Sequence, residues 1–590
     1  MKIKQKKVYS DNIIENILIN SGVEDINLFL NPDDSTLTKP DNYKNLNHAA
    51  KEIIASIATN KNITVLIDSD ADGFTSGSIT YNVLSDIVES FEATSNISYL
   101  THTTKAHGLT DEVMENIQQI DTDLLIIPDA ASNDIDNLLT LDTANYNVVV
   151  IDHHNIEDET YIDMIENVTI VNNQRSDNGE VNKHLTGAGM VYKLFEQVYN
   201  YIVTSEDKLT PLENYLDLVA IGQIGDASDL TNNEIRYLTF KGLNNIQNPF
   251  VKSVLELKNV DLDDKLSPTD MSFSIIPVIN AITRVGFKDD RNKLFESFTI
   301  NKDNNKEVVL EKRKLNKQTR KYETVSFNVL NTEKRANDLA KIKTQQDKYI
   351  KNKMNELDKH TDITKGILIY FDHNYSEKES VAGLVATKLA NKYERPCLVL
   401  SYNEEKDVYF GSARGITKVL DSFKDWCNNL GIFNFAQGHD NAFGVEIPLA
   451  NLPLLNGAID KLETNKEHVY EVDKLYENDV DKNVVNLLIK NKDIVGGKVE
   501  QITLGYKDMV IPRKNIYIKN QTVTFNIGGC SFVSWGTNDD IIDALQTGFT
   551  DNVTVDMVCK PFESSFGGKK TNKLIIEDIE VDDSDNDFFF

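Results

Sequence analysis

The chain has only four cysteines among 590 residues, and it contains no long hydrophobic run. Cys397, Cys427, Cys530 and Cys559 lie far apart and form no CxxC pair, which argues against a zinc knuckle or a disulfide framework. A reducing cytoplasm is therefore expected, that of a host cell if the protein is viral. No run of 18 apolar residues occurs, and no apolar segment follows the basic N-terminus, so neither a transmembrane helix nor a secretory signal is expected.

Positive charge is also scarce. The 62 Lys and Arg residues face 92 Asp and Glu, and the net charge of -30 argues against a surface coated with basic patches for duplex DNA. Residues 302–360 are an exception, because they hold 16 Lys and Arg against 9 Asp and Glu, a net charge of +7. This segment is either a nucleic-acid contact or the solvated face of a long helix.

The length predicts several domains, and the 40% hydrophobic content is typical of a globular protein. Between residues 63 and 242, short runs rich in Val and Ile alternate with helical segments, which predicts a parallel sheet of βαβ units. Four runs end in acidic or amide side chains, and the carboxyl edge of such a sheet would bring these ends together. The runs are 63–68, 97–101, 123–129, 147–152 and 168–173, and the end residues are Asp68, Asp129, Asp152 and Asn172.

The predicted fold class is α/β with a β-rich end. Few Gly or Pro residues interrupt the basic segment, so a helical connector is expected there, and a second α/β pattern and then a run of short strands follow it. The predicted parts are an N-terminal helical segment (1–60), a parallel-sheet domain (61–300), a helical connector (301–362), a smaller α/β domain (363–465), an OB-like β domain (466–576) and an acidic tail (577–590).

The first candidate site directly follows a predicted strand. Asp68, Asp70 and Asp72 are spaced so that all three carboxylates could surround a cation in a strand-to-helix turn, and Gly73 permits a tight turn. An EF-hand is excluded because Ile79 stands where that loop needs Glu. An acidic, metal-free helix cap remains the alternative.

Further ligand types recur at the same topological position. Asp129 and the sequence Asp152-His153-His154 end later strands, and Asp226 follows an apolar helix. Taken alone, each carboxylate could be a helix cap, and each histidine could have only a structural role. Together, such carboxylates repel one another unless cations neutralise them. Two divalent ions about 3.5–4 Å apart would do so and would create a phosphoryl-transfer site. Mixed imidazole and carboxylate ligands suit Mn²⁺ or a similar ion.

At these residues the sequence resembles the DHH phosphoesterase family, and within it the RecJ-like exonucleases. The order and spacing of the motifs agree, and the resemblance covers residues from about 10 to about 580. The matching motifs are 68–73, Asp129, 152–154, 185–189 (Leu-Thr-Gly-Ala-Gly) and Asp226, followed by the RecJ-like segments 226–243 and 279–286 and by the DHHA1-like segments 411–414 and 438–444.

Three positions depart from the pattern of this family. Ser69 stands where an aromatic residue is usual, Ala130-Ala131 replaces Cys-Gly after Asp129, and Gln437 replaces the first glycine of a Gly-Gly-His triplet. None of these changes removes an expected metal ligand.

The resemblance implies a metal-dependent exonuclease that degrades single-stranded DNA 5′ to 3′ to mononucleotides, in DNA repair, recombination or replication. It implies that two Mn²⁺ or Mg²⁺ ions activate water, that Asp129 bridges them, that His154 binds a phosphate oxygen and that Asp152 orients an imidazole. A narrow cleft between the two α/β domains would admit one strand. The implied ligands are Asp68, Asp70, Asp72, Asp129, His153 and Asp226, and the implied phosphate contacts are Arg284, Ser412, Arg414, Gly438 and His439.

Some alternatives stay open. A DHH enzyme that cleaves short oligonucleotides, cyclic dinucleotides or pyrophosphate would share the metal site, and a non-catalytic replication scaffold would keep the fold. Arg284 and Arg414 could instead form inter-domain salt bridges. Residues 577–587 carry seven acidic groups before three terminal Phe residues, so the tail could dock on replication or repair proteins, mimic DNA or only aid solubility. No membrane partner is expected.

Overall fold

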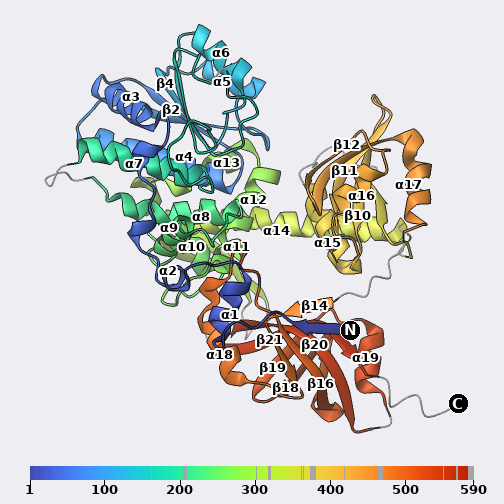
Figure 1. Ribbon diagram of the computed structural model, residues 1–590. Coiled ribbons are helices and arrows are strands. Elements are labelled where there is room, and N and C mark those ends of the chain that lie inside the picture. The colour runs from blue at the N-terminus through green and yellow to red at the C-terminus, as the bar shows by residue number, and fades with distance from the viewer. Residues whose placement is uncertain are drawn as a thin grey trace. The chain divides into compact units, whose positions relative to one another are not determined.

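The computed structural model forms two compact units (Figure 1). The first unit comprises Met1–Ile279, Asn292–Asn337 and Val469–Phe590, and the second comprises Asn280–Arg291 and Asp338–His468. Within the described residues, no helix is long and apolar enough to span a membrane. The structure describes residues 1–160, 162–203, 209–299, 302–315, 320–360, 362, 364–372, 381–417, 419–462, 469–548, 550–566 and 569–582.

The first unit contains the predicted parallel sheet. Its five strands lie in the order β3-β2-β4-β5-β6, and every neighbouring pair is parallel. The strands are rich in Val and Ile, and the three strands β2, β4 and β6 are buried along their whole length, as expected for a sheet covered on both faces. The strands are β2 (Ile63–Ile67), β3 (Ile97–Thr101), β4 (Leu124–Pro128), β5 (Asn147–Asp152) and β6 (Val168–Asn172).

Helices cover both faces of this sheet. On one face, side chains such as Leu125 and Val150 pack with apolar residues of α5 and α6. On the other face, α3, α4 and α7 lie against the strands (Figure 1). The helices are α3 (Leu46–Ala58), α4 (Ala71–Ser90), α5 (Asp111–Ile117), α6 (Ile135–Thr143) and α7 (Gly187–Ile202).

More helices extend the first unit beyond the sheet. The apolar helix α8 is buried and packs against α4, α7 and α9. These helices are α8 (Leu216–Gly225), α9 (Asn233–Leu243), α10 (Pro249–Leu257) and α11 (Pro268–Phe273), and α12 (Ile275–Val285) and α13 (Lys288–Phe298) follow them.

The N-terminal segment is not purely helical. After β1 (Lys2–Gln5), the helices α1 (Ile13–Asn20) and α2 (Ile26–Leu30) form as expected. The prediction was wrong at β1, which pairs in parallel with β14 (Val469–Val472) because Ile3 packs against Val472 and Val558.

The C-terminal part of the first unit is β-rich, as predicted. Its seven-stranded sheet has the order β15-β16-β20-β21-β19-β18-β17, and closure into an OB-type barrel stays a prediction. Helices α18 (Lys482–Lys490) and α19 (Asp539–Gln546) accompany it. The strands are β15 (Lys474–Glu477), β16 (Leu504–Pro512), β17 (Tyr517–Lys519), β18 (Thr522–Ile527), β19 (Cys530–Trp535), β20 (Asn552–Phe566) and β21 (Lys569–Val581).

Strand β21 corrects the start of the acidic tail. Residues 577–581 belong to this strand, because Ile576 and Ile579 are buried in the core of the β domain. Residues 583–590, which include the three terminal Phe residues, lie outside the described residues.

The connector is also corrected. Its first half is an antiparallel hairpin of β7 (Glu307–Leu315) and β8 (Tyr322–Leu330), and only α14 (Asn331–Leu357) is a long helix. The segment Tyr322–Leu330 alternates Val and Phe with polar residues, which is a strand pattern that the many lysines obscured. Most of β8 is exposed.

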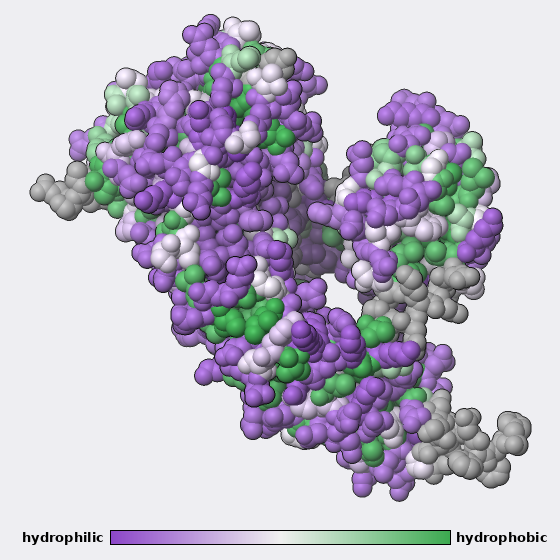
Figure 2. Space-filling model, in the orientation of Figure 1, coloured by the Kyte–Doolittle hydropathy of each residue, from purple (hydrophilic) through white to green (hydrophobic). Residues whose placement is uncertain are grey.

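The second unit is the predicted smaller α/β domain. Its sheet has the order β12-β13-β11-β10-β9, in which only β9 and β10 are parallel. On the face shown in Figure 2, hydrophilic residues predominate on both units. The elements are β9 (Leu368–Phe371), α15 (Ala382–Tyr393), β10 (Cys397–Asn403), β11 (Val408–Arg414), α16 (Phe423–Asn429), β12 (Phe435–His439), β13 (Ala442–Pro448) and α17 (Leu452–Ile459).

Candidate functional site

Three neighbouring strands of the parallel sheet end in buried carboxylates. Asp68 follows β2, Asp129 follows β4, and Asp152 is the last residue of β5. Each of the three residues is 1% exposed. Asn172 ends β6 and donates from its side chain to the carbonyl oxygen of His154 at 3.0 Å. The predicted meeting of polar strand ends at one sheet edge is therefore confirmed.

The first motif begins α4. Asp70 is the residue before the helix, and its side chain accepts a hydrogen bond from the Gly73 amide at 2.9 Å. A Cβ atom on Gly73 would lie 2.6 Å from the Cβ of Asp68, so only glycine lets the helix begin this close to the strand end.

The N-terminus of α7 holds Asp72. The Thr186 hydroxyl and the amides of Gly187 and Ala188 donate to its carboxylate at 2.8, 2.6 and 3.0 Å. The positive end of a helix dipole favours such an anion. Residues 185–189 thus fix one carboxylate of the first motif and bring it to the sheet edge.

Asp129 is the most crowded carboxylate of the cluster. Its backbone has φ 68°, a left-handed conformation that Asp tolerates better than most residues. Burial and the negative charges of Asp72, Asp70 and Asp68 raise its pKa well above the usual range. Its Oδ1 atom has no hydrogen-bond donor in the part of the chain that the structure describes. This buried oxygen among like charges is an environment that a cation would neutralise.

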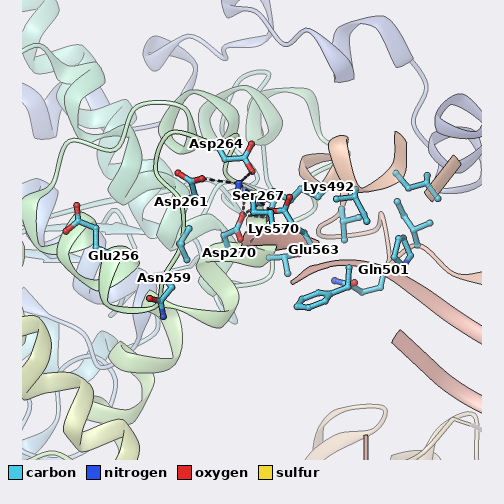
Figure 3. A pocket seen from close by; sticks show the side chains of 18 residues that line it. Glu256, Asn259, Asp261, Asp264, Ser267, Asp270, Lys492, Gln501, Glu563 and Lys570 are labelled. Carbon is cyan, nitrogen blue, oxygen red and sulfur yellow. Dashed lines mark hydrogen bonds and ion pairs between the residues drawn. The ribbon is translucent and has the colours of Figure 1, made fainter. Parts of the chain in front are cut away.

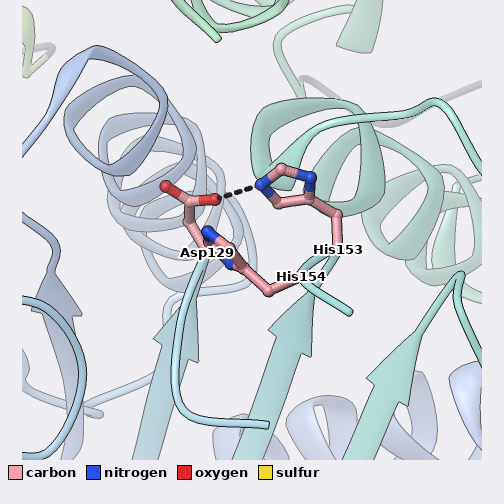
Figure 4. Close-up of side chains that lie close together, drawn as sticks. All are labelled: Asp129, His153 and His154. Carbon is pink, nitrogen blue, oxygen red and sulfur yellow. Dashed lines mark ion pairs between the residues drawn. The ribbon is translucent and has the colours of Figure 1, made fainter. Parts of the chain in front are cut away.

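His153 joins the cluster from the end of β5 (Figure 4). Its Nε2 atom lies 3.1 Å from Asp129 Oδ1, 3.7 Å from Asp72 Oδ2 and 4.0 Å from Asp226 Oδ2. Asp226 follows the last turn of α8, and burial and the charge of Asp72 raise its pKa to about 6. The structure therefore brings four of the six predicted ligands together around His153, and their mixed nitrogen and oxygen atoms suit a divalent transition ion.

Asp152 faces His154 rather than the centre of the cluster. Its Oδ1 accepts from His154 Nδ1 at 2.8 Å, and its Oδ2 accepts from the Ser132 amide at 3.1 Å. Burial alone would raise the pKa of Asp152, but His154 and His153 bring it below the usual range. In turn, the hydrogen bond to Asp152 raises the pKa of His154 to about 9. His154 is thus a cation at neutral pH.

We expect the substitution His154→Gln to destabilise the protein in a pH-dependent way. The pKa of His154 rises from 6.5 to about 9 on folding, so its stabilising effect is complete below 6.5 and is lost as pH rises through 9. Because the side chain is 53% exposed, we expect a loss of only about 1 kcal/mol near pH 6. Urea unfolding over a pH series measures it, with exposed His48→Gln as the control. A loss of stability in His154→Gln that grows as pH rises would contradict a raised pKa of His154.

Two histidines beside Asp68 were missed from the sequence. His102 Nε2 lies 3.3 Å from Asp68 Oδ1, and His107 Nδ1 lies 2.5 Å from Asp68 Oδ2. His102 directly follows β3. A search for polar residues at strand ends, which identified Asp129, would also have identified His102 if it had included histidine as well as acidic and amide residues. His107 lies in a loop, where no periodicity marks it.

In the second unit, the predicted phosphate contacts share a sheet face only in part. Arg414 and His439 both pair with Ala442, from β11 and β12, so their side chains leave the same face, and Ser412 lies two residues before Arg414. Gly438 has the opposite orientation, and a Cβ atom there would lie 2.9 Å from Phe443 Cα. Gly438 is therefore needed for strand packing.

The two predicted arginines of the second unit lie near each other. Burial lowers the pKa of Arg414, and repulsion from Arg284 adds to the effect. The hydrogen-bond acceptors of Arg414 within the described residues are the Thr387 hydroxyl at 3.1 Å and the Ala413 carbonyl at 2.7 Å, which are not carboxylates. Two neighbouring guanidinium groups favour an anion such as a phosphate.

Arg236, in the RecJ-like segment, has a structural role. It is 2% exposed and donates to the Asp493 carbonyl at 2.6 Å and to the Phe29 carbonyl at 3.2 Å. It thus links α9 to the N-terminal segment and the β domain within the first unit.

A cavity of about 560 Å³ lies elsewhere in the first unit (Figure 3). Lys570 lies 2.8 Å from Asp264 and 3.0 Å from Asp261, and Lys492 lies 3.1 Å from Asp270. With Glu256 and Glu563 also in the wall, five carboxylates face two lysines. This cavity does not suit a polyanion.

Comparisons with known proteins agree with this geometry. Residues 62–223 match the family model "DHH family, N-terminal domain". Over 591 residues the chain is 30% identical to YorK of Bacillus subtilis, whose name describes an SPbeta prophage-derived single-strand DNA-specific exonuclease. The alignment covers 97% of this chain and 96% of YorK.

More distant relatives share part of the chain or the fold. The single-stranded-DNA-specific exonuclease RecJ of Bacillus subtilis is 23% identical over 474 residues, which are 79% of this chain and 54% of that protein. The crystal structure of RecJ in complex with Mn²⁺ from Thermus thermophilus has a TM-score of 0.65 at 16% identity, with 96% of this chain and 76% of that chain covered. At this identity the structural likeness shows the fold.

Proposed function

Because the chain belongs to the DHH family, among its RecJ-like single-strand DNA-specific exonucleases, we propose that it hydrolyses single-stranded DNA from the 5′ end and releases mononucleotides. The observation that carries this proposal is the buried cluster in which His153 lies 3.1 Å from Asp129 and beside Asp72 and Asp226. Such a cluster is costly to bury without cations and is suited to hold them.

Two divalent ions, Mn²⁺ or Mg²⁺, are the proposed cofactors. When bound, they would lower the pKa of water and polarise the phosphate. Donor chemistry supports this assignment, since carboxylate oxygens suit both ions and imidazole favours Mn²⁺. The proposed ligands are Asp68, Asp70, Asp72, Asp129, His153 and Asp226.

The chain's own groups would orient the substrate. His154 is held by Asp152 with its ring half-exposed, so its free nitrogen can donate to a non-bridging phosphate oxygen. Asp152 fixes the ring orientation and keeps the imidazole charged. Asp152 therefore acts as a positioning residue.

Backbone phosphates would be bound by Arg284, Arg414, Ser412 and His439 of the second unit, with Gly438 shaping the strand beside them. The guanidinium fork can bind phosphate through two hydrogen bonds and makes no base-specific contact. Binding through the backbone would explain activity on any DNA sequence.

A time course on long single strands labelled at the 5′ or the 3′ end tests the proposal. We expect Mn²⁺-dependent release of mononucleotides from the 5′ label first, no activity with EDTA, and no activity in His153→Ala. Matched duplex DNA should resist digestion. Rapid cleavage of a dinucleotide or a cyclic dinucleotide, with long strands left intact, would replace this proposal by a small-substrate phosphodiesterase.

A further inference from the structure

Asp68 makes a second imidazole–carboxylate contact at the metal-site edge. The contact between Asp68 Oδ2 and His107 Nδ1, at 2.5 Å, has the same chemistry as the contact between Asp129 Oδ1 and His153 Nε2, at 3.1 Å. The Asp68 and His107 atoms can share one proton, whereas the Asp129 and His153 atoms lie close to each other without hydrogen-bond geometry. A divalent ion can replace such a proton.

The second contact has its own carboxylates. One ligand atom from each of Asp68, Asp70 and His107 lies within 4.8 Å of the others, as do atoms of Asp129, His153 and His154 in a separate group. These separate groups are what two neighbouring cation subsites require.

The loop that carries His107 is anchored rather than loose. Gly108 has φ 65° and donates its amide to Asp68 Oδ1 at 3.0 Å, and Leu109 donates its amide to Asp134 Oδ2 at 2.7 Å. A Cβ atom on Gly108 would lie 2.2 Å from the same Asp134 oxygen. The loop therefore presents His107 at a fixed place, while the ring stays 53% exposed and reachable by solvent ions.

His102 supports the same carboxylate from the protein interior. It is 1% exposed, and its Nε2 lies 3.3 Å from Asp68 Oδ1, on the oxygen that the Gly108 amide also contacts. Oδ1 is thus held by the protein, whereas Oδ2 faces only His107 among its hydrogen-bond contacts within the described residues. Neither ring nitrogen of His102 makes a hydrogen bond within the described residues, so the Gly108 amide is the hydrogen-bond donor that holds Oδ1.

We propose that His107 is a metal ligand, which together with Asp68 and Asp70 completes one of the two cation subsites. This inference rests on the proposed function and deepens it, because an imidazole in each subsite makes both prefer Mn²⁺ over Mg²⁺. His107 therefore sets the ion preference of the enzyme.

Ion titrations of the full chain test the inference. We expect the wild type to bind two Mn²⁺ ions, counted from the EPR signal of free Mn²⁺. In His107→Asn, one ion should bind at least about tenfold more weakly, while Mg²⁺ affinity changes by less than about twofold. The control His48→Asn replaces an exposed histidine of α3 and should match the wild type. Unchanged binding of both Mn²⁺ ions in His107→Asn would overturn the inference.

Pulsed EPR separates direct ligation from positioning. In His153→Asn, bound Mn²⁺ should still show ¹⁴N coupling from an imidazole, and the double variant with His107→Asn should lose it. Coupling that survives in the double variant would point to His102 or His154 and would overturn the inference. Absence of the coupling in His153→Asn would also overturn it. If the wild type binds no Mn²⁺ at all, the proposed function itself fails.

Discussion

The substitution Asp129→Asn is expected to abolish metal-dependent hydrolysis, by at least about 1,000-fold, and at the same time to stabilise the metal-free protein. Activity falls because an amide oxygen carries no charge and would hold the proposed cations less well than a carboxylate does. Stability rises because Asp129 is buried among Asp68, Asp70 and Asp72, and their repulsion disappears with its charge. Substitution of a residue that is needed only for folding would instead lower both the activity and the stability of the metal-free protein.

The stabilisation should depend on pH in a defined direction. The pKa of Asp129 is raised on folding, so the carboxylate destabilises the folded state as pH rises above the unfolded value of 3.8. We therefore expect Asp129→Asn to gain about 1–3 kcal/mol at pH 8 without metal and little at about pH 4. With saturating Mn²⁺, the wild type should become more stable than Asp129→Asn, because only the wild type gains stability from ion binding.

Urea unfolding with EDTA and with Mn²⁺ measures both effects, alongside nuclease assays. The control Asp263→Asn makes the same change at an exposed position and should alter neither quantity. Metal-free Asp129→Asn that is less stable than the wild type at pH 8 would contradict the crowding argument. Residual activity near the wild-type level would contradict the proposal that Asp129 is a metal ligand.

The strand-end carboxylates could be predicted because two rules act together. Val- and Ile-rich runs separated by helices specify parallel strands, and parallel strands place their carboxyl ends at one edge. Asp68, Asp129 and Asp152 are each the residue at which an apolar run stops, so sequence order alone assigns them to that edge.

Other features could not be predicted, because they depend on contacts that leave no pattern in the neighbouring sequence. His107 reaches Asp68 only because Gly108 adopts φ 65° and Asp134 holds the next amide, and neither contact leaves a periodic pattern. The hairpin of β7 and β8 was predicted as helix because the charged residues at the end of β7 resemble a solvated helical face. Strand β1 forms through pairing with Val469–Val472, far away in sequence.

The substitution Gly187→Ala should disable the site, although Gly187 is not itself a proposed metal ligand. A Cβ atom at this position would lie 2.4 Å from Asp129 Oδ1 and 2.5 Å from Asp129 Cβ. Asp129 cannot easily withdraw, because its backbone is held at φ 68° and its side chain is buried. The new methyl group must therefore displace either Asp129 or the start of α7, whose amide at Gly187 holds Asp72.

Either displacement moves a ligand, and a shift of about 1 Å costs on the order of 100-fold in rate. We also expect a loss of about 1–3 kcal/mol in the free energy of unfolding, as is usual for overpacking. The control is Gly457→Ala in α17, which also adds a methyl group to a helix but has nothing within 4 Å of the new atom. It should keep full activity and, if anything, unfold at higher urea concentration.

A double-mutant cycle decides whether the clash with Asp129 is the cause. The variant Asp129→Gly removes the side chain that the new methyl group meets, and glycine adopts φ 68° readily. In that background, Gly187→Ala should cost less than about 0.5 kcal/mol, so the two changes would be strongly non-additive. If Gly187→Ala costs as much free energy of unfolding in Asp129→Gly as in the wild type, the strain lies instead at the start of α7, whose amides donate to Asp72. The cost of Gly187→Ala is measured by unfolding in both the wild-type and the Asp129→Gly background. The cycle therefore does not require Asp129→Gly to be active.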